Sequence, residues 1–262
     1  IELSFPKGFL WGAATSAHQV EGGNIANDWW AWEQAGRIKE SSGLACDHYR
    51  RFAEDFDLAA RLGHRMHRLS LEWSRLEPEE NQWNEEELDH YFHVLHTLKK
   101  LGFQTFVTLH HFTNPAWVAR QGGWASRKTV NDFAGYVGKI CEKLGQYIDF
   151  WVTVNEPGIY ALFCYKDGIW PPYQKRPLRS LCVYRNMLDG HNQAYNVIHG
   201  YFPKARVGFA QGVAFNEAFH PRSFFDVGLH HTFTSWYTRA ERKNTFCRFG
   251  IYCGEPRLVF EE

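Results

Sequence analysis

The feature that most constrains the fold is a regular alternation of short apolar runs with longer amphipathic segments. Each run has the length of one strand, and its apolar residues do not alternate with polar ones, which is typical of strands buried on both faces of a parallel sheet. Parallel strands need long crossover connections, and the amphipathic segments between the runs have the length of helices. The predicted strands are residues 9–14, 65–71, 104–109, 150–154 and 206–211.

The segments between these runs carry helix signals. Residues 47–62 place apolar side chains at helical spacing, and Gly63 follows as a stop signal. A second helix begins after Asn84, with Glu87 three residues on as in a capping box, and a third follows Ser126. No G-x-G-x-x-G string follows a strand, which weakens a dinucleotide-binding fold. We therefore predict the α/β class and a TIM-type (β/α)8 barrel rather than an open sheet.

Charge and composition narrow the class of ligand. The chain has 29 Lys and Arg residues against 29 Asp and Glu, so its formal net charge is zero and it has no basic field for nucleic acid or anionic lipid. Aromatic residues make up 17% of the 262 residues, including 11 Trp. Aromatic rings pack in cores, but flat apolar rings also stack on the C–H faces of sugars. A neutral small-molecule substrate is the expectation.

The sequence shows neither a long apolar stretch for a membrane span nor a basic segment followed by an apolar one at residues 1–6. The six cysteines form no C-x-x-C pair, although Cys247 and Cys253 could pair in an oxidising compartment. No H-x-x-x-H string occurs, which argues against a metal-dependent hydrolase. We expect a cytoplasmic protein with reduced thiols and with no metal or cofactor.

The most informative segment is residues 150–157, FWVTVNEP, an apolar strand that ends in an amide, a carboxyl group and a proline. In β/α barrels the chemistry lies at the carboxyl ends of the strands, where Glu156 is expected. A carboxyl group held against tryptophan and proline is partly desolvated, which suits it to donate a proton to a departing oxygen. Asn155 beside it can hydrogen-bond a sugar hydroxyl. A lone strand-end Glu would more often be a solvated carboxylate, so the whole string carries the interpretation.

The string TVNEP at 153–157 resembles the acid/base motif of glycoside hydrolase family 1, the β-glucosidases and β-galactosidases. The segment 5–22, FPKGFLWGAATSAHQVEG, is similar to the opening strand of that family, and 67–75, HRLSLEWSR, resembles its second strand. The segment 108–115, TLHHFTNP, is similar to the end of its third strand. The resemblance covers roughly residues 5–211 in the family's order.

The resemblance implies roles for five residues. Glu156 would be the general acid/base, and Arg68 would hold the nucleophilic carboxylate ionised and oriented, a bidentate task for which Lys is a poor substitute. Gln19, His111 and Asn155 would bind sugar hydroxyls. Taken alone, each has a structural alternative: Gln19 a loop amide, Arg68 an ion-pair partner, His111 a core histidine. Asp28 and Trp29 lie where the family has a polar and aromatic loop, and no role is carried over to them.

The C-terminal part departs from the family pattern. Only 51 residues follow Gln211, fewer than three further β/α units of about 30 residues need, so the barrel is expected to be incomplete, with about five to six units. The chain is treated as one domain, residues 1–262, with a divergent tail at 212–262. The family's nucleophile lies in an Ile-Thr-Glu-Asn-Gly type of motif, and no such string occurs in the sequence. The substitute nucleophiles by residue type are Glu217, Asp226 and Glu255, and residues 225–231 and 249–256 are faintly similar to the approaches to later strands.

Two functional hypotheses remain open. The first is a retaining β-glycosidase, β-glucosidase-like, that hydrolyses terminal β-O-glycosidic bonds. The second is a sugar-binding or assembly-forming remnant or fragment that lacks the nucleophile and associates with itself or with a complementary fragment through exposed strand edges. The two hypotheses differ in whether a second carboxylate faces Glu156, because retaining glycosidases need two carboxyl groups about 5–5.5 Å apart.

Overall fold

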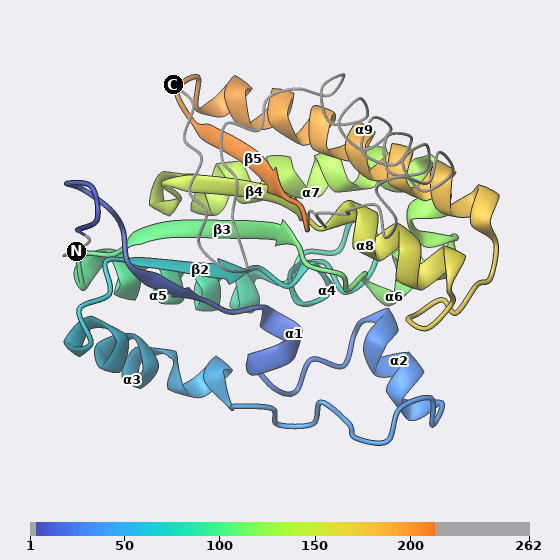
Figure 1. Ribbon diagram of the computed structural model, residues 1–262, viewed down its shortest axis with the longest axis horizontal. Helices are drawn as coiled ribbons and strands as arrows, with labels where there is room; N and C mark the ends of the chain where they lie inside the picture. The colour runs from blue at the N-terminus through green and yellow to red at the C-terminus, as the bar shows by residue number, and fades with distance from the viewer. Residues whose placement is uncertain (1–3, 213–262) are drawn as a thin grey trace, which may run out of the picture.

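The computed structural model describes residues 4–212, which form one parallel sheet covered by helices (Figure 1). The strand order in the sheet is β1-β2-β3-β4-β5, and each strand pairs in parallel with the next. This order, with each strand beside its predecessor, is that of consecutive β/α units in a barrel. The strands are β1 (Gly12–Ala14), β2 (Met66–Ser70), β3 (Gln104–His110), β4 (Phe150–Asn155) and β5 (Arg206–Ala210).

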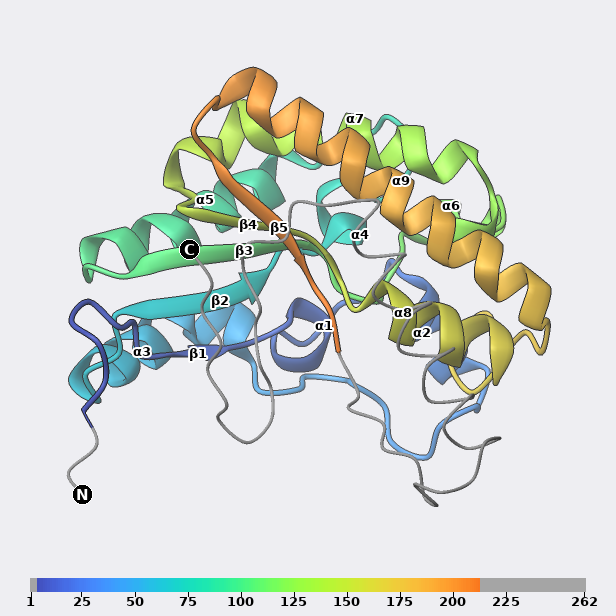
Figure 2. The same ribbon diagram turned by 45° about the horizontal axis from the view of Figure 1, so that its top comes forward.

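Long helices provide the crossovers between strands and lie on one side of the sheet, and short helices follow the carboxyl ends of the strands (Figures 1 and 2). The crossover helices are α3 (His48–Arg61), α5 (Glu85–Lys100), α7 (Lys128–Leu144) and α9 (Pro177–Tyr201). The shorter helices are α1 (Ala17–Val20), α2 (Asp28–Gln34), α4 (Trp73–Leu76), α6 (Ala116–Arg120), α8 (Pro157–Ala161), η1 (Gly123–Ala125), η2 (Gly145–Tyr147) and η3 (Leu162–Lys166).

The two faces of the sheet have different surroundings. Leu69, Val107 and Trp151 point toward the helices and belong to the buried hydrophobic core. On the opposite face, the register partners Phe106 and Phe150 stack with ring centroids 4.0 Å apart, and the Arg206 guanidinium lies 4.8 Å from the Phe150 ring centroid. In a β/α barrel this second face is the one directed into the barrel interior. The apolar character of both strand faces thus follows from the fold, as predicted.

The predicted elements agree with the structure, with small differences at their ends. The first strand is shorter than predicted, because regular pairing with β2 begins only at Gly12. Asn84 caps α5 by accepting hydrogen bonds from the backbone N–H groups of Glu86 and Glu87. The capping-box role of Glu87 is wrong: its carboxylate accepts a hydrogen bond from the Tyr49 hydroxyl and lies 3.7 Å from Arg75. A tertiary ion-pair network therefore uses a side chain that local sequence logic assigned to the cap.

Gly190 provides a test of how α9 packs on α7 and η1. A Cβ atom at Gly190 would lie 2.8 Å from Cζ3 of Trp124, whose ring is fully buried and whose indole N–H donates to His110. Because that ring is held in place, we expect Gly190→Ala to lower the free energy of unfolding by about 1–3 kcal/mol. Chemical denaturation of the full chain measures the change.

Gly200 in the same helix is the matched control. No atom lies within 4 Å of a Cβ built there, so Gly200→Ala gains helix propensity without a clash and is expected to stabilise by up to about 1 kcal/mol. Equal effects of the two substitutions would show that Gly190 does not mediate close packing.

Candidate active site

The candidate site lies at the carboxyl ends of the strands, and Glu156 occupies its most constrained position. Glu156 directly follows β4 and adopts a left-handed backbone conformation, with φ 46° and ψ 58°. Its N–H donates to the Ala210 carbonyl of β5 at 2.7 Å, and Pro157 then begins α8. A non-glycine residue in this conformation is uncommon and costs on the order of 1 kcal/mol, so the surrounding structure fixes it.

The Glu156 side chain lies beside Gly212, two residues beyond the end of β5. A Cβ atom at Gly212 would be 2.9 Å from Oε1 of Glu156, so a glycine there gives the carboxyl group its space. Register shifts between Val152 and Asn155 in the β4–β5 pairing, and such irregularities re-aim side chains at the ends of strands. Glu156 is half-buried. Trp151 does not contribute to this environment, because it packs in the helix-facing core against Phe202.

Arg68 joins three neighbouring strands beneath this position. From β2, its Nε donates to Oγ1 of Thr108 on β3 at 3.0 Å, and one terminal nitrogen donates to Oδ1 of Asn155 on β4 at 2.5 Å. Arg68 and Asn155 are both buried. The guanidinium therefore fixes the orientation of the Asn155 amide, whose Nδ2 is left to donate to another group.

His111 follows β3 and is half-buried. Burial, with the Arg68 charge and His110 as smaller causes, lowers the pKa of His111 to about 3. Its Nδ1 is buried and has no hydrogen-bond partner among the described residues. The imidazole is thus neutral over the physiological range, and a buried ring nitrogen remains for a ligand.

Within the described part of the chain, no hydrogen bond joins Gln19 to the other four predicted site residues. It belongs to α1, which is anchored by a hydrogen bond from the Ala17 N–H to Oγ of Ser70 at 2.7 Å. The Ser16 hydroxyl donates to the Gln19 side-chain oxygen, and Gln19 is exposed. The structure thus bonds Arg68 to Asn155 and brings His111 within the field of Arg68, whereas Gln19 contacts none of these three by hydrogen bonding.

Sequence reasoning missed a set of buried polar contacts around the site. Asp28 and Asn114 make three hydrogen bonds to each other, and the Asn114 amide also reaches Tyr160 and His110. His18, next to Gln19, contacts the Glu33 carboxylate at 3.1 Å. These partners are separated by up to 86 residues, and no periodicity or motif predicts such pairings.

Aromatic rings from α2, from η3 and from the segments that follow β3 and η3 meet next to these contacts. Trp170 lies 5.4 Å from Trp29, 5.0 Å from Phe112 and 4.9 Å from Phe163, measured between ring centroids. Phe112 directly follows His111, so the cluster adjoins the end of β3. The high aromatic content of the sequence is explained in part by this cluster and in part by core packing.

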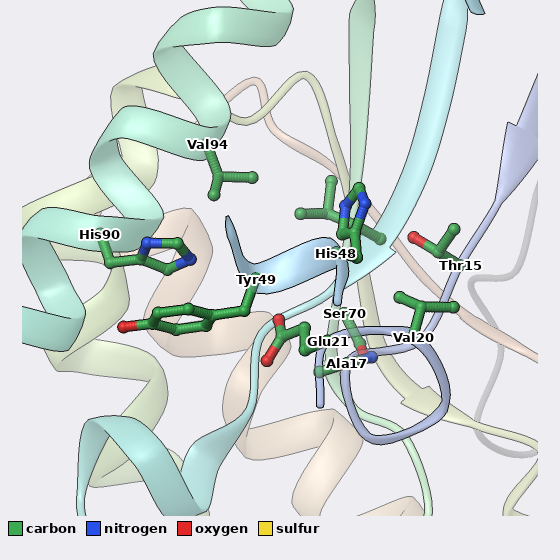
Figure 3. A pocket seen from close by; sticks show the side chains of 10 residues that line it. Thr15, Ala17, Val20, Glu21, His48, Tyr49, Ser70, His90 and Val94 are labelled. Atoms are coloured by element: carbon green, nitrogen blue, oxygen red, sulfur yellow. The ribbon is translucent and has the colours of Figure 1, made fainter. Parts of the chain in front are cut away.

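A small cavity lies away from Glu156, between β1, β2, α3 and α5 (Figure 3). Its volume of about 10 Å³ is room for one water molecule, not for a sugar. Glu21 lines it and accepts hydrogen bonds from Arg75 at 2.9 Å and Tyr91 at 2.8 Å. Burial outweighs the attraction of Arg75 and raises the pKa of Glu21 to about 7. The carboxyl group of Glu21 belongs to the packing around β1 and β2.

Within residues 4–212 no group of three or more His, Cys, Asp or Glu side chains is arranged to hold a metal ion. In the same part of the chain, no helix is both long and apolar enough to cross a membrane. Cys46, Cys141, Cys164 and Cys182 are free thiols. Cys247, Cys253, Glu217, Asp226, Glu255 and the predicted tail lie outside the described residues, apart from Gly212.

The sheet carries a carboxyl, an amide, an imidazole and a guanidinium group at the carboxyl ends of its parallel strands. This is where β/α-barrel enzymes have their active sites, so the fold and the site define the class as a β/α-barrel enzyme. The chain belongs to glycosyl hydrolase family 1, whose family model matches residues 1–261. The predicted family and barrel class are thereby confirmed.

The chain is similar to curated β-glucosidases. It is 32% identical over 229 residues to beta-glucosidase A of Thermotoga maritima, covering 84% of this chain and 50% of that protein. It is 38% identical over 181 residues to beta-glucosidase 11 of Arabidopsis thaliana, covering 66% of this chain and 35% of that protein. Among solved structures, a beta-glycosidase from Pyrococcus horikoshii matches with a TM-score of 0.85 and 34% identity, over 92% of this chain and 56% of that one. The chain thus spans about half the length of the bacterial relative.

Proposed function

We propose that this chain provides the acid/base half of a retaining β-glycosidase, β-glucosidase-like, acting on terminal β-O-glycosidic bonds. The observation that carries the proposal is the position of Glu156, held in a left-handed conformation at the end of β4, next to an Asn155 amide oriented by Arg68. The family membership and the names of the similar proteins support the same reaction class.

In the proposed reaction, the protonated Glu156 carboxyl donates its proton to the glycosidic oxygen as the bond to the anomeric carbon breaks. A second carboxylate attacks the anomeric carbon and forms the glycosyl-enzyme, and the Glu156 carboxylate then takes a proton from the water that hydrolyses it. Glu217, Asp226 and Glu255 remain candidates for that second carboxylate by residue type alone. None belongs to the described residues.

The other site residues bind and orient the sugar. Asn155 presents its Nδ2 to a hydroxyl, because its oxygen already accepts from Arg68. Neutral His111 supplies a ring nitrogen, and Gln19 is exposed above β1. We propose that Arg68 also holds the nucleophile ionised, a role implied by the family. A structure of the Thermotoga maritima β-glucosidase with glucoimidazole matches this chain at a TM-score of 0.83, which favours a glucose-shaped ligand.

A second candidate is a sugar-binding or assembly-forming remnant. Within the described residues, β1 and β5 are the two edges of the sheet, and edge strands carry unpaired backbone groups that associate with other chains. In this proposal a second copy or a complementary fragment covers these edges. A cytoplasmic location is proposed as well, supported by the free thiols of Cys46 and Cys182.

Release of nitrophenol from an aryl β-D-glucoside by the purified full chain, with the molar mass measured on the same sample, tests these proposals. We expect turnover together with binding of phenyl 1-thio-β-D-glucoside, a neutral analogue that the reaction does not cleave. Binding without turnover would overturn the proposal that this chain hydrolyses glycosides unaided, and it would favour the sugar-binding remnant. A folded, monomeric chain with neither property would contradict both. The matched sample is the same chain with phenyl 1-thio-β-D-mannoside, which should bind more weakly.

A further inference from the structure

Asp28 and Asn114 clamp two segments that lie 86 residues apart in the sequence. The Asp28 N–H donates to the Asn114 carbonyl at 3.0 Å, and the Asn114 N–H donates back to Oδ1 of Asp28 at 2.9 Å. Nδ2 of Asn114 lies 2.7 Å from the second carboxyl oxygen. The Ala116 N–H donates to the Ala26 carbonyl alongside. Both oxygens of Asp28 are therefore used on one residue of the loop that follows β3.

The Asn114 amide extends this clamp to two further elements. Its Nδ2 also lies 2.9 Å from the Tyr160 hydroxyl on α8, and its Oδ1 lies 3.1 Å from Nε2 of His110 at the end of β3. The Tyr160 N–H donates to the Glu156 carbonyl at 2.9 Å, so α8 continues directly from Glu156. α2 contacts α6, which lies just above it in Figure 1. One buried amide thus joins the segments that carry His111 and Glu156.

The protons in this network cannot all be satisfied in one arrangement. The Trp124 indole N–H can only donate, and it lies 3.0 Å from Nε2 of His110, so that nitrogen carries a lone pair. Burial lowers the pKa of His110 to about 4, which keeps the ring neutral. Oδ1 of Asn114 then faces a second acceptor. Turning the amide replaces this contact between two acceptors by one in which Nδ2 shares the Nε2 lone pair with the Trp124 N–H, and Oδ1 then accepts from the Tyr160 hydroxyl.

The turned amide requires a proton on Asp28, because Oδ1 of Asn114 then faces a carboxyl oxygen. Burial raises the pKa of Asp28 to about 7. The titratable groups that face it are Glu72, Tyr160, Tyr165 and Cys164, of which the Glu72 carboxylate raises its pKa further. Two arrangements are therefore compatible with this geometry: ionised Asp28 with the amide donating to it, and protonated Asp28 with the amide turned.

We propose that Asp28 is a positioning residue of the candidate site. Through Asn114 it holds the loop that carries His111 against α8, and its protonation state determines how tightly that loop is held. The inference rests on the proposed function. The ionised form holds the loop more tightly, because hydrogen bonds to a carboxylate are roughly twice as strong as neutral ones. Sugar binding is therefore tighter above the pH at which Asp28 ionises than below it.

Asp28→Asn tests this proposal, because an amide mimics the protonated carboxyl and does not titrate. At pH 8 we expect the variant to bind phenyl 1-thio-β-D-glucoside about tenfold more weakly than the wild type, and at pH 5.5 to bind it equally. The affinity step of the wild type near pH 7 should be missing from the variant. Asp57→Asn, which changes an exposed aspartate on α3, should keep the step. A variant that retains the full wild-type step would overturn the proposal.

Exchanging the two side chains distinguishes loss of the specific pair between Asp28 and Asn114 from a general loss of folding. In the Asp28→Asn, Asn114→Asp double variant, the new amide can donate to the new carboxylate, and the Tyr160 hydroxyl can donate to it as well. We expect the double variant to recover most of the affinity lost at pH 8. A loss equal to the sum of the two single losses would contradict the pairing.

Amide hydrogen exchange of residues 111–114 at pH 8 measures how often the loop opens, and it needs no sugar. We expect faster exchange in Asp28→Asn than in the wild type, and unchanged exchange in Asp57→Asn. If the wild type binds no thioglucoside at any pH, the proposed function fails. The exchange measurement still shows whether Asp28 holds the loop. Unchanged exchange in Asp28→Asn would overturn the inference whatever the sugar result.

Discussion

Replacement of Glu156 by glutamine is expected to slow hydrolysis of an alkyl β-glucoside by about 10²- to 10⁴-fold, the usual contribution of a positioned general acid. Glutamine has the shape of glutamate, so the backbone bond to Ala210 and the start of α8 are preserved. It cannot donate the carboxyl proton that an alkoxide leaving group requires. The ratio kcat/KM for alkyl and dinitrophenyl β-glucosides measures the effect, because it reports the cleavage step and not the later hydrolysis of the glycosyl-enzyme, in which Glu156 acts as the base. Because dinitrophenolate leaves without protonation, cleavage of the bond should be impaired far less with that substrate.

Glu142→Gln is the matched control, because Glu142 lies exposed on α7, remote from the strand ends. Its rates should equal those of the wild type with both substrates. A loss of kcat/KM in Glu156→Gln that is the same for both leaving groups would show that Glu156 does not act as the acid. Unchanged rates with the alkyl glucoside would place the acid elsewhere.

The order of elements was predictable because it follows from short-range physics. Strands buried on both faces appear as apolar runs, and glycines such as Gly63 and Gly102 adopt positive φ just after the helices end. These signals depend on residues close together in the chain. The register of the sheet was not predictable in this way, because it depends on how the strand ends meet in space.

In the candidate site, too, the residues could be predicted from local sequence, whereas the contacts between them could not. Glu156, Asn155 and Arg68 lie in or directly after strands, so a motif locates them without tertiary information. The hydrogen bond between Arg68 and Asn155 joins residues 87 positions apart and emerges only from the β2-β3-β4 order. The Gly212 contact with Glu156 is similar, since a glycine beyond a strand gives no signal that a carboxyl group occupies its Cβ space.

Buried polar pairs were the least predictable feature. Asp28 is the first residue of α2, and its sequence neighbours do not indicate that both its oxygens are used by Asn114. Its raised pKa results from burial produced by packing of α2 against the loop after β3. Electrostatics of this kind follows from the assembled fold and not from composition.

Arg68→Lys is expected to lower kcat/KM for an aryl β-glucoside by about 10²-fold and the free energy of unfolding by about 1–3 kcal/mol. A lysine keeps the positive charge, so His111 stays neutral, but its single ammonium group cannot span Oγ1 of Thr108 and Oδ1 of Asn155 in the geometry of the guanidinium. The Asn155 amide is then free to rotate, and its Nδ2 no longer faces one direction. Kinetics, affinity for the thioglucoside and denaturant unfolding together measure the change.

Arg61→Lys is the control, because Arg61 is exposed on α3 and, among the described residues, pairs with Asp57 at i,i+4, an interaction of about 0.5 kcal/mol or less. It should leave both rate and affinity unchanged. If Arg68→Lys loses stability but keeps wild-type affinity, Arg68 braces the sheet without orienting Asn155. If it loses affinity at unchanged stability, the orientation of Asn155 dominates. The geometry of two hydrogen bonds from one buried guanidinium predicts that both quantities fall together, since the same two bonds join the strands and set the amide.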